Sequence, residues 1–179
     1  LPTDGEIKIS GLDIIKDRQE IKEIINVSPQ ETAIAPNLSV KENLEFMADV
    51  YQIKNKNEKI NELIKIFKLD EVLNQKAKTL SGGWQRKVSI AISLINEPKI
   101  LFLDEPTLGL DVIARKELWK VINELKGKIT IILTTHYMEE AEKLSDRIGI
   151  MADGKLKCIG TPEELKQKAK TDDFEEAFI

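Results

Sequence analysis

Hydrophobic residues recur with two different periodicities along the chain, and the change of periodicity divides the chain into regions. In VKENLEFMADVYQI (40–53) and NEKINELIKIFKL (57–69), apolar residues recur every three or four positions, which predicts two amphipathic helices. KILFLD (99–104) and ITIILTT (129–135) are short and mostly apolar, which is typical of strands buried on both faces of a parallel sheet. A helical region of about residues 31–97 therefore interrupts a strand–helix pattern.

Shorter elements are predicted on both sides of that region. Residues 5–15 are expected to form a strand or hairpin arm, and residues 21–27 (IKEIINV) a second strand that ends at a Ser-Pro-Gln turn. Residues 112–125 and 137–144 are expected to be helices, whereas RIGIM (147–151) and KLKCIG (155–160) are strands around an Ala-Asp-Gly hairpin turn. Strands alternating with helices predict an α/β core with a mostly parallel sheet.

Two helix starts and one chain end carry local signals. Ser39 with Glu42 three residues later has the pattern of a capping box. Thr161 caps the last predicted helix, with Pro162 at its first position. Residues 172–179 are acidic with two phenylalanines, and we interpret them as a frayed end in preference to a docking strip.

Candidate chemistry gathers where two predicted strands end. Asp104 closes KILFLD and Glu105 follows it, whereas His136, the only histidine, comes directly after ITIILTT. Ligands of open α/β sheets bind beyond the carboxyl ends of the strands, so these three side chains are expected at one edge. A rigid aspartate suits the water shell of Mg²⁺, a glutamate can polarise an attacking water, and an imidazole can contact a phosphate. The structural alternative is an ordinary Asp-Glu turn and a helix-capping histidine.

Two further groups of residues are weaker candidates from pattern alone. Ser81, Gly82 and Gly83 precede a predicted helix over about residues 84–96, where free N–H groups and the helix dipole favour a phosphate. Ser81 could equally be a plain N-cap, with the glycines forming a flexible loop. Gln30 ends a predicted strand beside a turn, so its amide could reach a metal or a water at the same sheet edge.

Composition excludes several classes of protein. With 179 residues, 41% of them hydrophobic and 32% charged, the chain is expected to fold as a globular domain with a sizeable core. A net charge of −4 gives no indication of nucleic acid as a partner. A single cysteine, Cys158, excludes an internal disulfide framework and is typical of a reducing cytosol.

At this point the motifs resemble those of one family, the nucleotide-binding subunits of ATP-binding-cassette transporters. LSGGWQRK (80–87) resembles the signature motif, ILFLDEP (100–106) the Walker B strand with its catalytic glutamate, and GLD ending at Asp111 the D-loop. NVSPQETAIAPNLSVKENL (26–44) resembles the Q-loop, and TTHYMEEAEKLSDRIGIM (134–151) the switch-histidine region. The motifs occur in the family's order over essentially the whole chain. The finer similarity is to subunits of exporters for drugs, antibiotics or polysaccharides.

The resemblance implies a P-loop NTPase-like fold with ATP and Mg²⁺ as cofactors. Its implied parts are the core up to the Q-loop (1–30), an inserted helical subdomain with the signature motif (31–97), the core with Walker B, D-loop and switch histidine (98–170), and an acidic tail (171–179). Residue roles follow from the same resemblance. Asp104 and Gln30 would hold Mg²⁺ largely through water, Glu105 would be the general base, and His136 would be the γ-phosphate switch. Ser81, Gly82 and Gly83 would contact the nucleotide held by the opposite subunit. Asp111 would lie at the interface between the subunits.

The sequence departs from the family pattern in two respects. Trp84 and Lys87 stand where the family usually has glutamine and arginine. The phosphate-binding Walker A loop, G-x-x-x-x-G-K-[ST], has one near-match, Gly149 to Lys155, but leucine follows the lysine and the flanks are predicted strands, so we interpret it as a hairpin turn. We therefore expect the loop to lie upstream of a fragment. A half-site module that lends only its signature motif to a partner is the alternative.

The resemblance also implies partners and a location. A second nucleotide-binding subunit and a membrane-spanning permease subunit would bind the chain on the cytoplasmic face of the membrane, where it would power export by ATP hydrolysis. As given, the chain is expected to bind MgATP poorly. A related cassette ATPase acting on DNA or ribosomes is disfavoured, because the chain has no basic surplus and no coiled-coil arms.

Overall fold

The computed structural model describes residues 3–178 and divides the chain into two compact units, one up to Ile132 and one from Leu133 onward. The elements of the first unit are β1 (Lys8–Ile9), β2 (Leu12–Asp13), α1 (Arg18–Ile24), β3 (Ile25–Ser28), α2 (Val40–Val50), α3 (Lys56–Phe67), η1 (Leu69–Val72), η2 (Ala77–Thr79), α4 (Gly82–Ser93), β4 (Ile100–Asp104) and α5 (Val112–Leu125). After β5 (Thr130–Thr134), which spans the division, come α6 (Met138–Leu144), β6 (Ile148–Ala152), β7 (Lys155–Gly160), α7 (Pro162–Ala169) and α8 (Phe174–Phe178).

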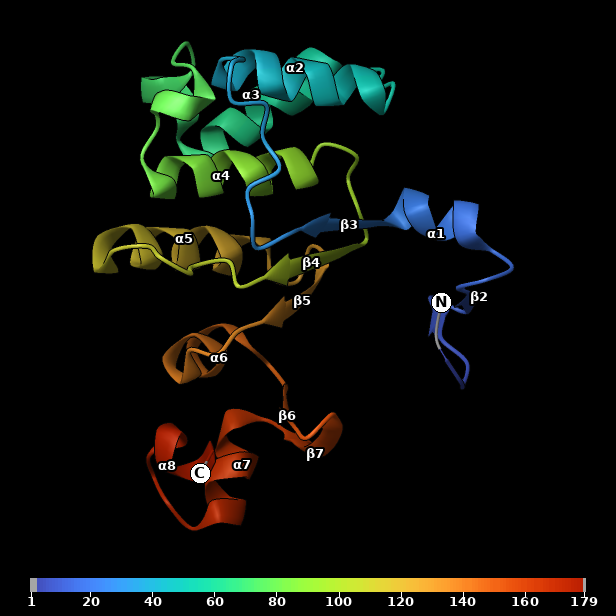
Figure 1. The fold of residues 1–179 in the computed structure, drawn as a ribbon, viewed down its shortest axis with the longest axis vertical. Helices are drawn as coiled ribbons and strands as arrows, with labels where there is room; N and C mark the ends of the chain where they lie inside the picture. Colours follow the sequence, from blue (N-terminus) through green and yellow to red (C-terminus); the bar gives the residue numbers. More distant parts are fainter. Residues whose placement is uncertain (1–2, 179) are drawn as a thin grey trace. The chain divides into compact units, whose positions relative to one another are not determined.

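The first unit holds a small sheet with the order β3-β4-β5. β3 and β4 are parallel, with Val27 opposite Phe102 and Ser28 opposite Leu103. α4 packs against β3, and α1 leads directly into β3, as Figure 1 shows. In β4, Leu101 and Leu103 are buried, whereas Ile100 and Phe102 are half-buried and Asp104 is exposed. The predicted burial on both faces is therefore complete on one face only.

Two predictions about strands were wrong. Residues 21–27 are not one strand, because α1 continues to Ile24 and β3 begins only at Ile25. The buried Ile21 and the half-buried Ile24 are three residues apart, which suits one face of a helix, and the residues between them are good helix formers. β5 is not a buried strand either: its residues alternate between exposed and half-buried, as befits a strand at the edge of its sheet.

Helices α2, α3 and α4 form the predicted helical region between β3 and β4, and α2 and α3 lie together in Figure 1. α2 begins with the predicted capping box: the backbone N–H of Glu42 donates to the Ser39 hydroxyl at 3.2 Å, and the N–H of Ser39 donates to the Glu42 carboxylate at 2.7 Å. Fully buried side chains from all three helices make the core of this region; they include Val40, Leu44, Leu63, Phe67 and Ile90.

The second unit contains the predicted hairpin. β6 and β7 are antiparallel, and both turn residues have left-handed backbones, Asp153 with φ 52° and Gly154 with φ 70°. This confirms that Gly149–Lys155 is a hairpin and no phosphate-binding loop. Thr161 and Glu164 form the predicted cap of α7, with Pro162 at its first position.

The end of the chain differs from the expected frayed tail. α8 is a short helix, and its Phe174 is 4% exposed, packed in a cluster with Ala141 and Leu165. Its start is fixed locally, because the Asp173 carboxylate accepts from the backbone N–H groups of Glu175 and Glu176. Ile179 lies outside the described residues.

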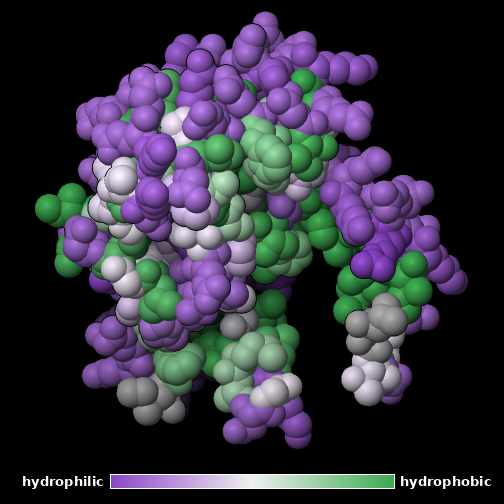
Figure 2. All heavy atoms as spheres, turned by 45° about the horizontal axis from the view of Figure 1, so that its top comes forward, coloured by the Kyte–Doolittle hydropathy of each residue, from purple (hydrophilic) through white to green (hydrophobic). Residues whose placement is uncertain are grey.

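Figure 2 shows the hydropathy of one face of the molecule. Figure 2 shows mainly hydrophilic residues over the end of the first unit that carries α2 and α3, with smaller hydrophobic areas between them. Among residues 3–178, no helix has both the length and the apolar character needed to span a bilayer.

Candidate functional site

The parallel pair β3–β4 brings three of the predicted site residues to one sheet edge. Gln30 follows the carboxyl end of β3 by two residues, Asp104 is the last residue of β4, and Glu105 comes next. The register places Ser28 opposite Leu103, so these ends are level with each other. Gln30 and Asp104 are exposed and Glu105 is partly buried. This part of the predicted convergence is therefore present in the structure.

Arg86 of α4 connects these residues, and the sequence analysis did not single it out. The side chain is 4% exposed. Its guanidinium donates to five backbone carbonyls: Pro106 from Nε at 2.8 Å, Pro29 and Gln30 from Nη1 at 2.5 and 3.2 Å, and Asp104 and Glu105 from Nη2 at 2.6 and 2.8 Å. One buried cation thus ties the helix of the signature motif to both strand ends.

Glu105 has an unusual backbone conformation. Its φ is 46°, in the left-handed region that residues with a Cβ seldom occupy. The turn that follows is closed by the N–H of Leu108, which donates to the Glu105 carbonyl at 3.2 Å. Six other described residues with a Cβ share this region of φ, so the conformation identifies a constrained turn and does not by itself identify Glu105 as functional.

The Ser81–Gly83 segment is an exposed start of α4. Ser81 occupies the N-cap position, but its hydroxyl makes no cap bond to the helix, so the plain N-cap alternative is not met in full. Instead, the Gln85 side chain holds the preceding loop by donating to the carbonyls of Ala77 and Leu80 at 3.2 and 3.1 Å. The N-terminus of a helix with an exposed serine and glycine fits the chemistry of phosphate binding.

The two glycines have different surroundings. A Cβ on Gly82 would lie 3.9 Å from Leu110, an ordinary contact, whereas one on Gly83 would lie 3.0 Å from the Cβ of Ala114. Gly83 therefore permits close packing of α4 against the first turn of α5, a role that the sequence analysis did not foresee. The same packing places the signature segment next to the D-loop.

Asp111 is the N-cap of α5. Its carboxylate accepts from the backbone N–H groups of Ile113 at 2.9 Å and Ala114 at 3.0 Å. The bond from Ala114, followed by that from Ile113, lowers the pKa of Asp111 below its usual range. The residue is exposed and charged, and its predicted place at an interface stays a prediction.

Trp84 and Lys87, the two departures from the family pattern, contact each other. The Lys87 ammonium lies 4.5 Å from the centroid of the Trp84 ring and 2.7 Å from a Glu117 carboxylate oxygen. The hydrogen bond from Lys87 is the main cause of a lowered pKa at Glu117. The lysine thus joins α4 to α5 through one cation–π contact and one ion pair.

His136 belongs to the second unit and follows β5 by two residues. It is exposed, and its ring centroid lies 4.3 Å from that of Tyr137. Together with Arg147 and Met138 it lines a cavity of about 480 Å³ within this unit. Its predicted position beside Glu105 stays a prediction.

The residues suit Mg²⁺ held mainly through water. No group of three or more His, Cys, Asp or Glu side chains that could hold a metal directly occurs among residues 3–178. One exposed carboxylate, Asp104, and one exposed amide, Gln30, extend from backbone segments that Arg86 joins. Mg²⁺ keeps several of its water ligands, so this pair is a suitable donor set.

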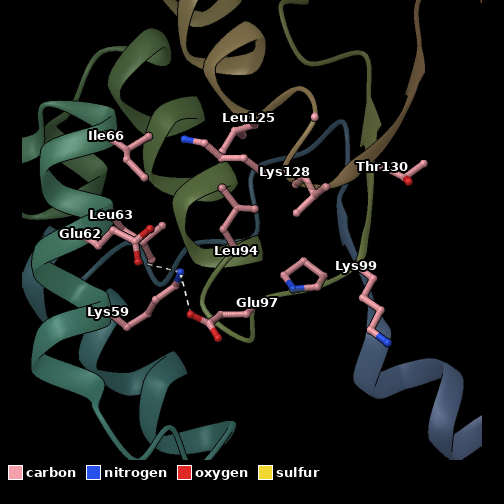
Figure 3. A pocket seen from close by; sticks show the side chains of 13 residues that line it. Lys59, Glu62, Leu63, Ile66, Leu94, Glu97, Lys99, Leu125, Lys128 and Thr130 are labelled. Atoms are coloured by element: carbon pink, nitrogen blue, oxygen red, sulfur yellow. Dashed lines mark hydrogen bonds and ion pairs between the residues drawn. The ribbon is translucent and has the colours of Figure 1, made fainter.

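A cavity of about 560 Å³ lies elsewhere in the first unit (Figure 3). Lys99 and Thr130, at the amino ends of β4 and β5, belong to its lining. Lys59 pairs there with Glu62 at 3.0 Å and Glu97 at 3.1 Å, as the dashed lines show. Ligands of open α/β sheets bind at the carboxyl ends, so this cavity is not the candidate nucleotide site.

The chain is similar to several known proteins. The family model described as ABC transporter matches residues 1–108. The chain is 41% identical over 169 residues to the phospholipid-transporting ATPase ABCA3 of Homo sapiens, covering 93% of this chain and 10% of that protein. It is 43% identical over 169 residues to ABC transporter A family member 3 of Arabidopsis thaliana, covering 92% of this chain and 18% of that protein. The chain thus spans less than a fifth of each of these two relatives.

Two solved structures share the fold. An ATP-binding subunit of an ABC transporter superposes with a TM-score of 0.83 at 26% identity, over 99% of this chain and 76% of that one. A dimeric ATP-binding cassette in a post-hydrolysis state, bound to ADP and Pi, superposes with a TM-score of 0.75 at 27% identity, over 89% of this chain and 74% of that one. The predicted P-loop NTPase-like α/β fold is confirmed. The chain belongs to the ABC transporter family.

Proposed function

We propose that this chain is part of an ATPase that powers transport through a separate membrane subunit, with export as the direction. The observation that supports this most strongly is the junction at Arg86. There the backbones of Gln30, Asp104 and Glu105 meet the helix that follows the signature motif. Five motifs in the order of the family accompany this junction.

In the proposed reaction Glu105 accepts a proton from the water that attacks the γ-phosphate of ATP. Asp104 and Gln30 would hold Mg²⁺ through its water shell, and the bound metal would supply charge neutralisation at the phosphates. His136 contacts the γ-phosphate and responds to its loss. Gln30, at the entry to the helical region, transmits the change to the membrane subunit.

The site is proposed to be shared between two subunits. Ser81, Gly82 and Asp111 are exposed, and Gly82 lies beside Leu110, the residue that precedes Asp111, so we expect this region to face a second nucleotide-binding subunit. The similarity to a dimeric cassette bound to ADP and Pi supports this arrangement. The signature segment would contact the nucleotide held by the opposite subunit, with both subunits on the cytoplasmic face of the membrane.

Purification of the native polypeptide from its membranes tests the proposal. A membrane-spanning subunit should co-purify, and ATP hydrolysis by the complex should increase when the transported substrate is added. Because one relative is named as a phospholipid-transporting ATPase, a phospholipid is the first cargo to test. Co-purification of nucleic acid in place of a membrane protein would contradict the proposal.

A further inference from the structure

We propose that Arg86 is a positioning residue that holds the backbone of Glu105 in its left-handed conformation and fixes Pro29–Gln30 to the same point. The inference rests on the proposed role of Glu105 as the base. Arg86 itself is not expected to touch nucleotide, since its donors are directed at main-chain carbonyls.

The number of bonds identifies arginine as the residue that this position requires. A guanidinium carries five N–H groups in a planar fork, and here five carbonyl oxygens accept from them. Three of those acceptors, Asp104, Glu105 and Pro106, are consecutive, so the fork restrains a whole turn of backbone. A lysine keeps the charge but has three donors at a single point, and a glutamine has only two.

The restrained turn includes the strained residue. Glu105 has φ 46°, and a conformation that is costly for a residue with a Cβ persists only where its surroundings determine it strongly. Arg86 binds the carbonyls on both sides of Glu105 as well as its own. Without these bonds the turn is free to relax to an ordinary backbone conformation, which would redirect the Glu105 side chain.

Arg86 also couples the signature segment, Ser81–Gly83, to the proposed base Glu105. It is the fifth residue of α4, one turn after Gly82, so any shift of Ser81–Gly83 along the helix moves the guanidinium as well. Contact of nucleotide with the signature segment and the orientation of Glu105 are therefore expected to change together.

The first test measures backbone hydrogen exchange in the native polypeptide, with no need for catalysis. Arg86→Lys and Arg86→Gln should both accelerate exchange at least tenfold in residues 104–110, where the N–H of Leu108 closes the turn. Exchange in α2 should stay unchanged and serves as the control for folding. Arg18→Gln, at an exposed arginine, is the matched control and should change neither segment.

A measurement on the unmodified protein covers the case in which the variants do not fold. The Nε–H of Arg86 should be strongly protected from exchange with solvent, and that of Arg18 should not. Equal, fast exchange of the two groups would overturn the proposal, as would unchanged exchange of residues 104–110 in folded Arg86 variants.

The second test compares kcat and KM for ATP hydrolysis. Arg86→Lys should lower kcat at least tenfold with little change in KM, because nucleotide binding does not use the side chain. Full activity of Arg86→Lys would overturn the inference and show that charge alone suffices. If the unmodified protein hydrolyses no ATP, the proposed function fails, and the exchange measurements still decide whether Arg86 holds the turn.

Discussion

Gly83 of α4 packs closely against Ala114 of α5, since a Cβ on Gly83 would lie 3.0 Å from the Cβ of Ala114. A Cβ at position 83 would therefore be in unusually tight contact with Ala114, which would have to shift slightly to admit it. The start of the signature helix is thereby held against the start of the helix that follows the D-loop.

Gly83→Ala should therefore destabilise the first unit by about 1 kcal/mol through overpacking. The second variant, Ala114→Gly, removes the opposing methyl group and should relieve the clash in the double variant, although glycine within α5 itself costs about 1 kcal/mol. Chemical denaturation of the unmodified protein, the two single variants and the double variant measures the coupling between the two substitutions. Strictly additive effects of the two substitutions would contradict the contact.

The pair Lys87–Glu117 should make stability depend on pH. The pKa of Glu117 is lowered from its usual 4.5, chiefly by the hydrogen bond from Lys87, so the charged pair stabilises the fold above that pH. The contribution is lost as pH falls through the lowered pKa of the folded state. Because the carboxylate is 53% exposed, its effect should be small and sensitive to salt.

Glu117→Gln should accordingly lower stability at pH 7 by about 0.5 kcal/mol and make no difference in strong acid. Denaturant midpoints of both proteins between pH 7 and pH 3 measure this. A stability difference between the two proteins that grows as the pH falls would contradict a stabilising Lys87–Glu117 pair.

The capping box of α2 predicts a local effect. Ser39→Ala removes the acceptor for the N–H of Glu42 and should cost about 1 kcal/mol. Hydrogen exchange should increase in the first turn of α2. Thr161→Ala is the matched variant in the second unit and should affect the first turn of α7 instead. Equal exchange changes at both helices in either variant would contradict local capping.

Phe174 tests whether the chain end is a structural part of the second unit. Phe174→Ala should destabilise this unit by about 3 kcal/mol, because the ring is buried against Ala141 and Leu165. Phe178, which is 43% exposed, provides the matched control, and Phe178→Ala should have a much smaller effect. Thermal unfolding of both variants gives the comparison. Equal, negligible effects would restore the interpretation of a frayed end.

What could be predicted from the sequence was mainly local. The capping box at Ser39, the helix cap at Thr161 and the Asp153-Gly154 turn depend on neighbouring residues, and all three were predicted correctly. α1 was missed because its isoleucines suggested a strand and only the burial of Ile21 reveals the helix. α8 was missed because an acidic segment gives no sign of the hydrophobic cluster that Phe174 joins.

The candidate site, too, could be predicted from the sequence only in part. Residue type and strand ends were enough to bring Gln30, Asp104 and Glu105 to one edge. Arg86 could not be found, because its acceptors are main-chain carbonyls up to 57 residues away in the sequence. Every residue has such a carbonyl, so no sequence pattern distinguishes these five. The role of Gly83 in packing depends likewise on a distant alanine.

The central claim is that Glu105 activates water for ATP hydrolysis. The most direct test is Glu105→Gln in the native polypeptide, with ATP turnover and ATP binding measured on the same preparation. A loss of at least a hundredfold in turnover is predicted, with ATP binding retained, because the amide keeps the shape of the side chain but is a far weaker base. Turnover within a few-fold of the unmodified protein would contradict the account.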